Sequence, residues 1–459
     1  MIGNVDGINN DYIQGWAVDE EDADNRVPLE VFYNGELLTS TVAGYPRADL
    51  LQADIGDGMN GFFVALPALD KPEDAEVYVM VAGTDQQLGA TKTVSRRPRC
   101  SRTGILASEM LALHSTPLHS LQGLEFNGET IRMGGILLPP KGNPFSVRMR
   151  STPGTEIKFR YPVHSPSAGD WYWYWPNSGW SGFQVEIDVP ASTGDSPHFD
   201  LWFEWDGMDE EYTRMGRNHL RVPKDIGAYQ NFPVGDQLTR VQRFDTNRRV
   251  ALAGYNDHRQ IAELAEHYGV DLPNSVVFDW GCGHGRVIRH FADRHRVKEA
   301  WGVDIDPENI EWLQAHVPSV NAATVPLLPP TDLPDQFVDL VYAISVMTHL
   351  TWDVQEAWLK ELKRITKPGG LLFLTYCGPT SAAFASRFLY PEWLEQWQKT
   401  GFDDSIDSLD LNGKIGDDDY YRNTKQTPEV TREFWGRYFE VVDIHECLFG
   451  YQDVAVLRA

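Results

Sequence analysis

The chain has 459 residues, of which 42% are hydrophobic, and it carries 40 Lys and Arg against 66 Asp and Glu, a formal net charge of −26. This length exceeds what one hydrophobic core usually serves, so two or three domains are expected. An acidic surface repels phosphate backbones and anionic lipid, which disfavours nucleic acid and acidic membranes as partners and favours a neutral or cationic ligand. The same charge is also typical of a surface that only confers solubility.

No apolar run reaches the roughly 18 residues that a membrane helix needs, so we expect no membrane insertion. The opening stretch, MIGNVDGINNDYIQGW, has no basic segment followed by an apolar one, which predicts a cytoplasmic protein without a secretory signal. The four cysteines, Cys100, Cys282, Cys377 and Cys447, are far apart and form no CxxC pair. This spacing indicates reduced thiols and argues against disulfides or a zinc site. The oligomeric state is left open.

Residues 1–97 have the pattern of short strands. Apolar and polar residues alternate on both sides of Asn34-Gly35, a dipeptide that a type I′ hairpin turn favours because both central residues take positive φ. The segments GFFVALP and EVYVMVAG predict further strands of similar length. We therefore expect an antiparallel β-sandwich.

A second all-β domain is predicted over 103–222, after the basic linker SRRPRCSR. It opens with a hairpin around Asn127-Gly128 and continues through FSVRMRS, EIKFRYPV, GFQVEIDVP and FDLWFEWDG. Six of the fifteen tryptophans of the chain fall in this range, a composition that separates it from its neighbours.

The densest aromatic stretch, WYWYWPNSGW at 171–180, is interpreted as a strand of this second domain. Alternation would place Trp171, Trp173 and Trp175 on one face and the two tyrosines on the other, so a sandwich could bury only one set. The outward face would either hold a sugar ring, with Trp173 as the candidate glycan contact, or be covered by the C-terminal domain.

From 226 to 459 the periodicity changes to strands alternating with helices. VVFDWG, WGVDI, FVDLVYAIS and LLFLTYC have the composition of buried strands, and WDVQEAWLKELKRIT has the spacing of an amphipathic helix. This alternation predicts a parallel, Rossmann-like α/β sheet. The closing segment, YFEVVDIHECLFGYQDVAVLRA, predicts two final strands.

The loop after the first of these strands reads Asp279-Trp-Gly-Cys-Gly-His-Gly285-Arg286. Its glycines allow a sharp turn and close approach of a ligand to the backbone. A phosphate-binding loop would end in Gly-Lys-Ser/Thr, and a dinucleotide fingerprint would need its third glycine at Arg286. Asp279 would repel a pyrophosphate and attract a cation, while Asp304 ends the next strand where a carboxylate can hold a ribose. A ligand with a ribose, a positive centre and no phosphate is S-adenosylmethionine.

These residues resemble the class I S-adenosylmethionine-dependent methyltransferases, through VVFDWGCGHGR, WGVDIDPENI, PDQFVDLVYAISVMTHL and LKRITKPGGLLFLTYCG, over roughly 250–459. The resemblance implies that the loop lies against the methionine part of the cofactor, that Asp304 holds the ribose, and that Ser345 lies nearby. Asn321 or Ala322 would contact the adenine. The implied cofactor-binding set is Asp279, Gly281, Cys282, Gly283, His284, Gly285, Asp304, Ile305, Asn321 and Ser345. Cys282 is alternatively a packing residue, and His284 a helix cap.

His349 is the candidate catalytic residue because it follows the fourth strand of the sheet, on the side where ligands collect. A neutral imidazole can take the hydroxyl proton during O-methylation, although the residue could instead only position the loop. Tyr421 and Asn423 are candidate acceptor contacts in the insertion before the last strands. No metal-binding pattern is found, since the acidic runs 403–404 and 417–419 are typical of solvated loops.

The N-terminal segments NVDGINNDYIQGWAVDE and GDGMNGFFVALP resemble small β-sandwich domains attached to bacterial enzymes of cell-surface glycan assembly. We therefore expect a role in polysaccharide biosynthesis, with O-methylation of a sugar hydroxyl on a glycan or a glycosylated lipid carrier. Two alternatives stay open. The acceptor is a small metabolite or a protein, or the chain is a glycan-binding protein whose methyltransferase domain is inactive.

Overall fold

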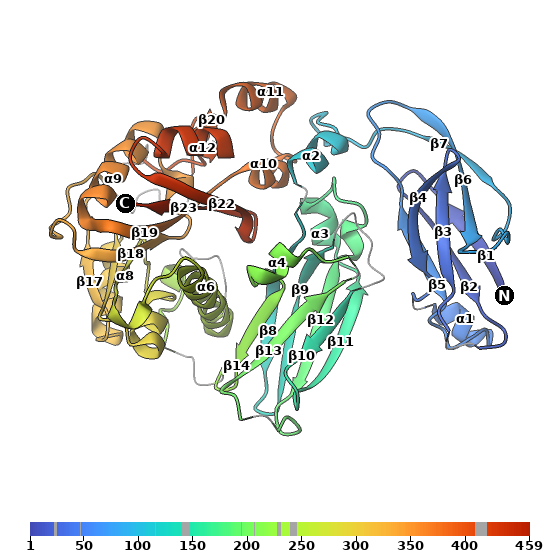
Figure 1. Cartoon of the computed structure of the whole chain (residues 1–459), viewed down its shortest axis with the longest axis horizontal. Helices are drawn as coiled ribbons and strands as arrows, with labels where there is room; N and C mark the ends of the chain where they lie inside the picture. Colours follow the sequence, from blue (N-terminus) through green and yellow to red (C-terminus); the bar gives the residue numbers. More distant parts are fainter. Residues whose placement is uncertain are drawn as a thin grey trace.

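The computed structural model describes residues 1–22, 25–45, 47–114, 116–139, 147–193, 195–205, 207–226, 231–238, 246–408 and 420–459, so the acidic run 417–419 lies outside the described residues. Three parts follow one another in space as they do along the chain (Figure 1). Strands from the N-terminus lie at one end, a second group of strands lies in the middle, and the α/β part lies at the other end.

The N-terminal part is rich in strands, which form two sheets. One sheet has the order β1-β2-β5 and the other β4-β3-β6-β7. Their bounds are β1 Ile2–Ile8, β2 Tyr12–Val18, β3 Pro28–Tyr33, β4 Glu36–Val42, β5 Gly61–Ala65, β6 Glu73–Val81 and β7 Lys92–Arg96, with helix α1 at Ala48–Gln52. The expected hairpin turn is confirmed, since Asn34 and Gly35 have φ of 50° and 83° between β3 and β4. Val5 and Phe62 of the first sheet share a core with Leu29 and Val79 of the second.

The middle part also forms two sheets, in the orders β11-β12-β9-β8 and β10-β13-β14. The strands are β8 Leu118–Phe126, β9 Thr130–Leu138, β10 Arg148–Ser151, β11 Glu156–Val163, β12 Gly182–Asp188, β13 His198–Glu204 and β14 His219–Pro223, and the helices are α2 Ala107–Leu113, α3 Pro166–Trp171 and α4 Glu210–Arg214. Val185 and Phe203, from opposite sheets, share a core that also includes Leu252 of the C-terminal part. The core of the middle part is therefore continuous with its neighbour.

The strand predicted for residues 171–180 is wrong. Trp171 ends α3, and Ser178–Trp180 form a turn of 3₁₀ helix. Pro166 lies in the first turn of α3, where a missing N–H costs nothing, and Asn177 has a left-handed backbone with φ of 59°. Local hydrogen bonds, such as Tyr172 N to the Ala168 carbonyl, therefore replace strand pairing. These rings therefore do not lie on the two faces of a strand, although Tyr172 and Tyr174 are buried and Trp171 is exposed.

The C-terminal part contains one seven-stranded sheet, in the order β17-β16-β15-β18-β19-β23-β22. The strands are β15 Val276–Trp280, β16 Glu299–Asp304, β17 Asn321–Thr324, β18 Val338–Ala343, β19 Thr366–Tyr376, β22 Glu440–Phe449 and β23 Gln452–Arg458. The first five pair in parallel, and β23 is antiparallel to both of its neighbours. The prediction of a parallel α/β sheet closed by two further strands is confirmed.

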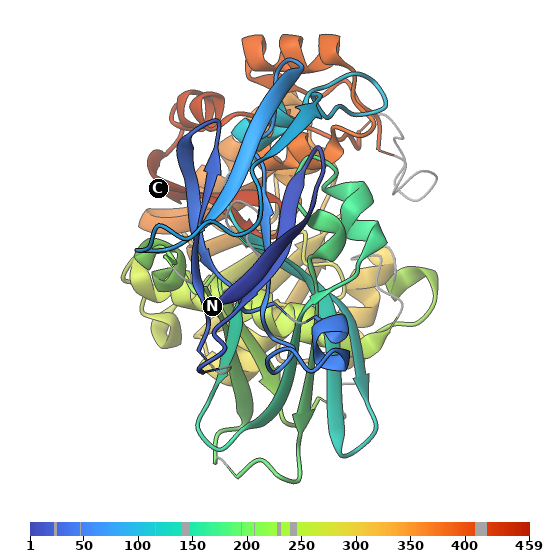
Figure 2. The same ribbon diagram turned by 90° about the vertical axis from the view of Figure 1, so that its right-hand side faces the viewer.

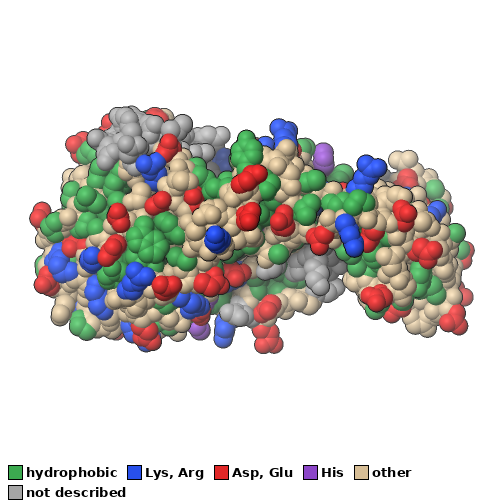
Figure 3. Space-filling model, turned by 90° about the horizontal axis from the view of Figure 1, so that it is seen from above, with side chains coloured by type: hydrophobic (Ala, Val, Ile, Leu, Met, Phe, Trp, Pro, Cys, Tyr) green, Lys and Arg blue, Asp and Glu red, His purple; other side chains and the backbone are tan. Residues whose placement is uncertain are grey.

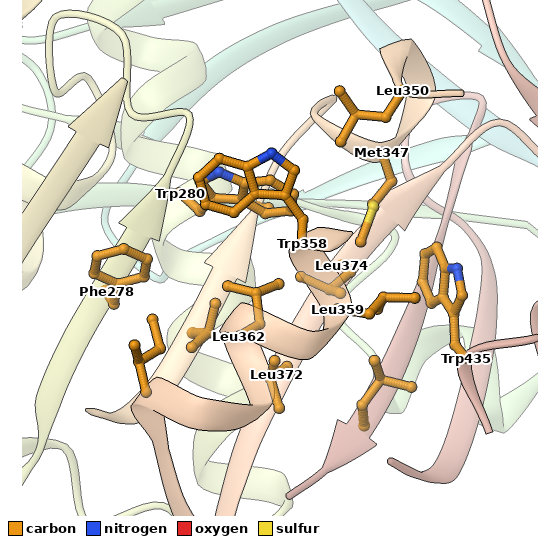
Figure 4. Packing of buried hydrophobic residues seen from close by; sticks show 14 of the residues in the cluster. Phe278, Trp280, Met347, Leu350, Trp358, Leu359, Leu362, Leu372, Leu374 and Trp435 are labelled. Atoms are coloured by element: carbon orange, nitrogen blue, oxygen red, sulfur yellow. The ribbon is translucent and has the colours of Figure 1, made fainter. Parts of the chain in front are cut away.

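Helices cover this sheet on both faces. They are α6 Asn247–His267, α7 Ile288–His290, α8 Pro307–His316, α9 Trp352–Ile365, α10 Pro379–Ala385, α11 Pro391–Thr400 and α12 Pro428–Trp435, with a π turn at Phe291–His295, short 3₁₀ turns at Leu272–Asn274 and Met347–His349, and a small pair of strands, β20 Phe402–Asp403 and β21 Lys425–Gln426. Figure 4 shows the core on one face, where Trp280 of β15 lies beside Trp358 of α9, with ring centroids 4.8 Å apart. No helix within the described residues is long and apolar enough to cross a membrane.

The aromatic stretch forms the contact between the middle and C-terminal parts. Tyr172, Tyr174 and Trp175 are buried in one cluster with Ala382 of α10 and Trp397 of α11. Figure 2, turned by 90° from the view of Figure 1, has the N-terminal strands in front of the other two parts, and Figure 1 shows α2 beside α10, which it contacts. Acidic side chains are dispersed over the molecule in the space-filling view (Figure 3), as the even spread of charge along the chain predicts.

Candidate active site

A cavity of about 890 Å³ lies at the carboxyl edge of the parallel strands. Ligands of open α/β sheets collect at this edge, where the strand order reverses, and here β15 lies between β16 and β18. One side of the cavity is formed by loops after β15, β16 and β18, and the other by residues of β8, α3 and β14 of the middle part. The cavity therefore belongs to two parts of the chain.

The glycine loop after β15 is held tightly against its surroundings. The N–H groups of Gly281 and Cys282 both donate to the Val303 carbonyl, at 2.8 and 3.0 Å. Gly281 has φ of 80°, and a Cβ atom there would lie 2.4 Å from Cγ2 of Val346. Only glycine fits this position without strain or collision. The loop backbone thus forms a surface of the cavity without side chains projecting from it.

Asp304, at the end of β16, is fixed by two backbone groups. Its Oδ2 accepts from Gly283 N at 2.7 Å, and its Oδ1 accepts from Asp306 N at 2.9 Å. Burial raises the pKa of this carboxyl to about 6. Hydrogen-bond donors from a bound ligand would favour its ionised form, as the hydroxyls of a ribose would.

Asp279 is a second buried carboxyl of the same wall, 4% exposed. The Tyr342 hydroxyl donates to its Oδ2 at 2.9 Å, and burial raises the pKa of Asp279 to about 7. A buried carboxylate without a paired cation is unfavourable, so a positively charged ligand would offset its desolvation. The two carboxyls and the glycine loop fit S-adenosylmethionine, which carries a positive sulfur and a ribose.

Most residues of the expected site line this cavity. They are Asp279, Gly281, Cys282, Gly283, Asp304, Ile305, Ser345, His349, Tyr421 and Asn423. Cys282 also packs inward, because a Cβ atom on Gly302 would lie 2.9 Å from its Sγ. Sequence reasoning thus identified the carboxyl edge of the sheet and its loops.

Four expected site residues do not line the cavity. His284 is fully buried, with its ring edge-on to Phe232 and Trp312 at 5.5 and 6.0 Å between centroids. Gly285 has φ of 73° and lies against Leu313, so its position serves helix packing. Burial lowers the pKa of His284 to about 3, which keeps the ring neutral.

Asn321 and Trp173 lie elsewhere for different reasons. Asn321 begins β17 and pairs in register with Trp301, whereas Thr324 pairs with Asp304 at the carboxyl edge. The strand starts later than expected, which leaves Asn321 at its far end, and Val325 lines the cavity instead. Trp173 donates from Nε1 to Ser386 Oγ of the C-terminal part, at 3.0 Å.

His349 closes the short 3₁₀ turn after β18. Its Nδ1 lies 2.8 Å from the Arg422 carbonyl oxygen. Because a carbonyl only accepts, Nδ1 carries the proton, and Nε2 is the basic nitrogen of the neutral ring. The ring stacks on Tyr421 with centroids 4.0 Å apart and planes 11° from parallel.

Ser345 and the segment 421–424 hold the same corner together. Ser345 has φ of 62°, its N–H donates to Thr375 Oγ1 at 2.6 Å, and its Oγ accepts from Gln452 Nε2 at 3.0 Å. The Asn423 amide donates to the Asp407 carbonyl at 2.7 Å, which fixes its orientation. A backbone hydrogen bond from Arg422 N to the His349 carbonyl, at 2.9 Å, attaches this segment to the 3₁₀ turn.

Several cavity residues were not expected from the sequence. Asp306, Asn309, Val346 and Thr348 neighbour expected residues along the chain, and extending each loop by a few positions would have found them. Other cavity residues belong to the middle part, among them His119, Arg217 and His219. No sequence motif relates these residues to the site. No group of three or more His, Cys, Asp and Glu suited to a metal ion occurs within the part of the chain that the structure describes.

Comparison with known proteins places this fold and site in context. Residues 278–374 match the family described as "Methyltransferase domain". Similar solved structures include an S-adenosylmethionine-dependent methyltransferase from Methanosarcina mazei, with 16% identity over 42% of this chain and 96% of that chain and a TM-score of 0.33. A magnesium protoporphyrin IX methyltransferase from Synechocystis, solved with bound S-adenosylhomocysteine, has 16% identity over 49% of this chain and 93% of that chain, with a TM-score of 0.33.

A methyltransferase from Mesorhizobium loti is similar at 14% identity, covering 45% of this chain and 98% of that one, with a TM-score of 0.32. The family match extends from β15 to β19 and includes the glycine loop, Asp304 and the turn that carries His349. The C-terminal part is the catalytic domain of an S-adenosylmethionine-dependent methyltransferase. The methyl acceptor is not indicated by this match.

Proposed function

We propose that the protein transfers a methyl group from S-adenosylmethionine to a sugar hydroxyl of a glycan or of a glycosylated lipid carrier, in the cytoplasm. The observation that supports this proposal is the placement of His349 in the same cavity as Asp279 and Asp304. The proposed general base thereby shares one cavity with the carboxyls that fit the cofactor. The remaining volume extends toward the middle part and is available to the acceptor.

Bound S-adenosylmethionine supplies an electrophilic methyl group on a positively charged sulfur. Asp304 would accept hydrogen bonds from the ribose hydroxyls, and Asp279 would balance the positive charge of the ligand. The turn at Gly281, Cys282 and Gly283 would approach the methionine part through its backbone. Ile305 and Ser345 complete this half of the wall.

His349 would act as the general base. During O-methylation, Nε2 of His349 would take the proton that the acceptor hydroxyl loses. Bound S-adenosylmethionine would supply the methyl group, with S-adenosylhomocysteine as the other product. The hydrogen bond from Nδ1 to the Arg422 carbonyl directs the basic nitrogen away from that carbonyl. Tyr421, stacked on the ring, would hold the imidazole in place and contact the acceptor together with Asn423.

The proposal also assigns roles to the other two parts. We assign three domains: a β-sandwich over 1–97, an aromatic-rich β-sandwich over 103–222, and the methyltransferase domain over 226–459. The resemblance of NVDGINNDYIQGWAVDE to domains of cell-surface glycan enzymes supports a sugar acceptor. The wall that residues of β8 and β14 add to the cavity supports a direct role of the middle domain in holding that acceptor.

The proposal is tested by measuring S-adenosylhomocysteine formation by the full chain with neutral oligosaccharides, glycosylated polyprenyl phosphates, free amino acids and a protein extract as acceptors. We expect turnover with at least one sugar acceptor and none after Asp304→Asn. Turnover only with an amino acid or a protein would overturn the sugar assignment. Failure of the chain to bind S-adenosylhomocysteine at all would overturn the cofactor assignment itself.

A further inference from the structure

The side of the cavity that the middle domain supplies differs in charge from the acidic chain as a whole. Residues 103–222 contain nine Lys and Arg against fourteen Asp and Glu, a net charge of −5. The described residues of this range that line the cavity nevertheless include no carboxylate, and their ionisable groups other than tyrosine are His119, Arg217 and His219. Burial lowers the pKa of both histidines, so Arg217 is the cation that this range contributes to the described lining.

Arg217, in the turn between α4 and β14, is the first of two cavity cations that form no ion pair among the described residues. Its guanidinium lies over the Tyr212 ring, 5.8 Å from the centroid. Its Nε is buried and has no hydrogen-bond partner, and among the described residues no carboxylate forms an ion pair with it. A buried guanidinium nitrogen without an acceptor is costly, so an anionic ligand at this position would offset its desolvation.

Lys425 of β21 is the second such cation, and it lines the cavity from the methyltransferase domain. The residue is only 6% exposed, and its Nζ lies 6.0 Å from the centroid of the Trp393 ring. Within the described ranges of the chain, no carboxylate pairs with this ammonium group. Lysine is seldom buried to this extent unless it is paired, which indicates a ligand that supplies the missing charge.

The two cations come from the two sides of the cavity and act on two cysteines that lie next to α10. Burial raises the pKa of the Cys447 thiol, and the nearby Arg217 guanidinium opposes this rise. Burial likewise raises the pKa of Cys377, and Lys425 opposes that rise. Both cysteines line the cavity next to α10. Arg217 and Lys425 therefore contribute positive potential at the same region.

The acidic side chains around the cavity are engaged elsewhere. Asp257 pairs with Arg286, and Asp306 caps α8 through Glu308 N. Asp279 and Asp304 belong to the half that fits the cofactor. Asp453 lies near Arg217 but outside the cavity lining, and burial raises its pKa to about 7, which weakens it as a counterion near neutral pH.

We propose that the methyl acceptor carries an anionic group, a carboxylate or a phosphate, and that Arg217 and Lys425 bind this group against the wall shared by the middle and methyltransferase domains. This inference rests on the proposed function and narrows its acceptor to an acidic sugar, such as a uronate or a sugar phosphate. The net negative charge of the protein does not exclude this ligand, because Arg217 and Lys425 supply positive charge at the cavity itself.

The test uses the full chain saturated with S-adenosylhomocysteine and titrated with glucose 1-phosphate, glucuronate and glucose in a calorimeter. We expect one of the two anionic sugars to bind at least tenfold more tightly than glucose. The sugar that binds more tightly identifies the anion as phosphate or carboxylate. Neither anion binding more tightly than glucose would overturn the inference.

Variants assign the binding to the two cations. Arg217→Gln and Lys425→Met should each weaken the anionic sugar at least tenfold, Arg217→Lys should restore most of the affinity, and affinity for S-adenosylhomocysteine should stay unchanged. Arg214→Gln and Lys399→Met are matched controls, because both residues are exposed and outside the cavity lining. The inference would be contradicted if Arg217→Gln and Lys425→Met bound the anionic sugar with wild-type affinity. It would also be contradicted if these variants lost affinity only for S-adenosylhomocysteine. Absence of S-adenosylhomocysteine binding in the wild type would instead refute the proposed function.

Discussion

The Trp173 indole donates a hydrogen bond from Nε1 to Ser386 Oγ, at 3.0 Å, and so joins the middle domain to the methyltransferase domain. Beside it, Trp171 stacks on Phe384 of α10 with ring centroids 4.8 Å apart. Phe384 stacks in turn on Tyr451, in the turn between β22 and β23, also at 4.8 Å. The aromatic stretch is thus the structural link between the two walls of the cavity.

This link predicts a measurable contribution to stability. Trp173→Phe keeps a ring but removes the donor, and we expect the free energy of unfolding to fall by about 1 kcal/mol, with a lower thermal midpoint. Trp180→Phe is the control, because Trp180 is 47% exposed and should change the midpoint little. Equal midpoints for the two variants would show that the bond contributes nothing.

His349 is predicted to act in turnover and not in cofactor binding. We expect His349→Ala to lower kcat by about 10²- to 10⁴-fold while the affinity for S-adenosylhomocysteine stays within twofold of wild type. His316→Ala is the control, since His316 is exposed at the end of α8 and lies outside the cavity. Near-normal turnover of His349→Ala would refute the base role and leave His349 as a positioning residue.

Cofactor affinity should depend on pH through Asp279 and Asp304. Burial raises their pKa values to about 7 and about 6, and a cationic ligand with hydroxyl donors favours the ionised forms. Lowering the pH from 8 to 5 should therefore weaken S-adenosylmethionine binding, by up to about tenfold per pH unit for each carboxyl that must ionise. Calorimetry at several pH values measures this slope, and Asp279→Asn should flatten it. A flat profile for the wild type would contradict the prediction.

The same shifts have the opposite consequence for the protein without cofactor. A carboxyl whose pKa is raised on folding stabilises the fold below its ordinary pKa of about 4, and this contribution is lost as the pH rises through about 7 for Asp279. Asp279→Asn keeps an acceptor for the Tyr342 hydroxyl and removes the buried charge. We expect its thermal midpoint to exceed that of wild type at pH 8, with the difference vanishing near pH 4. A higher wild-type midpoint at pH 8 would be evidence against this account.

Gly281 is predicted to be irreplaceable for cofactor binding. Gly281→Ala introduces strain at φ of 80° and places its Cβ atom 2.4 Å from Val346 Cγ2, so both stability and S-adenosylhomocysteine affinity should fall. Gly83→Ala separates the two effects, because Gly83 has φ of 72° with nothing within 4 Å of the added Cβ. The control should lose about 1 kcal/mol of stability from strain alone and bind the cofactor normally. Equal cofactor affinities of the two variants would contradict the close fit.

Local patterns predicted much of the fold. The apolar spacing in WDVQEAWLKELKRIT corresponds to α9, and the dipeptide Asn34-Gly35 to the β3–β4 turn, because each pattern reflects a preference of the backbone itself. The strand predicted at 171–180 was wrong although burial alternates from Trp171 to Tyr174, because an alternation of buried rings does not by itself determine the backbone. There Pro166 and Asn177 determine the backbone instead.

The site could be predicted where one loop carries it and not where distant segments meet. Asp279 and Asp304 lie at the carboxyl ends of consecutive, neighbouring strands of one sheet, so their meeting is implied by the fold. Arg217 and Lys425 come from different domains, and no motif relates them. Asn321 was expected at the cavity because the strand was predicted to end before it. In the structure β17 begins at Asn321, and in a strand of four residues an error of a few positions moves a residue from one end to the other.

The cavity is divided between two domains. Its two sides can therefore meet different chemical requirements, one for the methyl donor and one for the acceptor. The glycine loop and the carboxyls at the edge of the sheet are constrained by the donor, whereas residues of β8 and β14 are free of that constraint. Grafting a different middle domain onto the same contact at α10 would therefore exchange the part of the proposed acceptor site that carries Arg217, and would leave Lys425, Tyr421 and the proposed methyl-transfer apparatus in place. The architecture is suited to recombination, in which new specificities arise by replacing one wall.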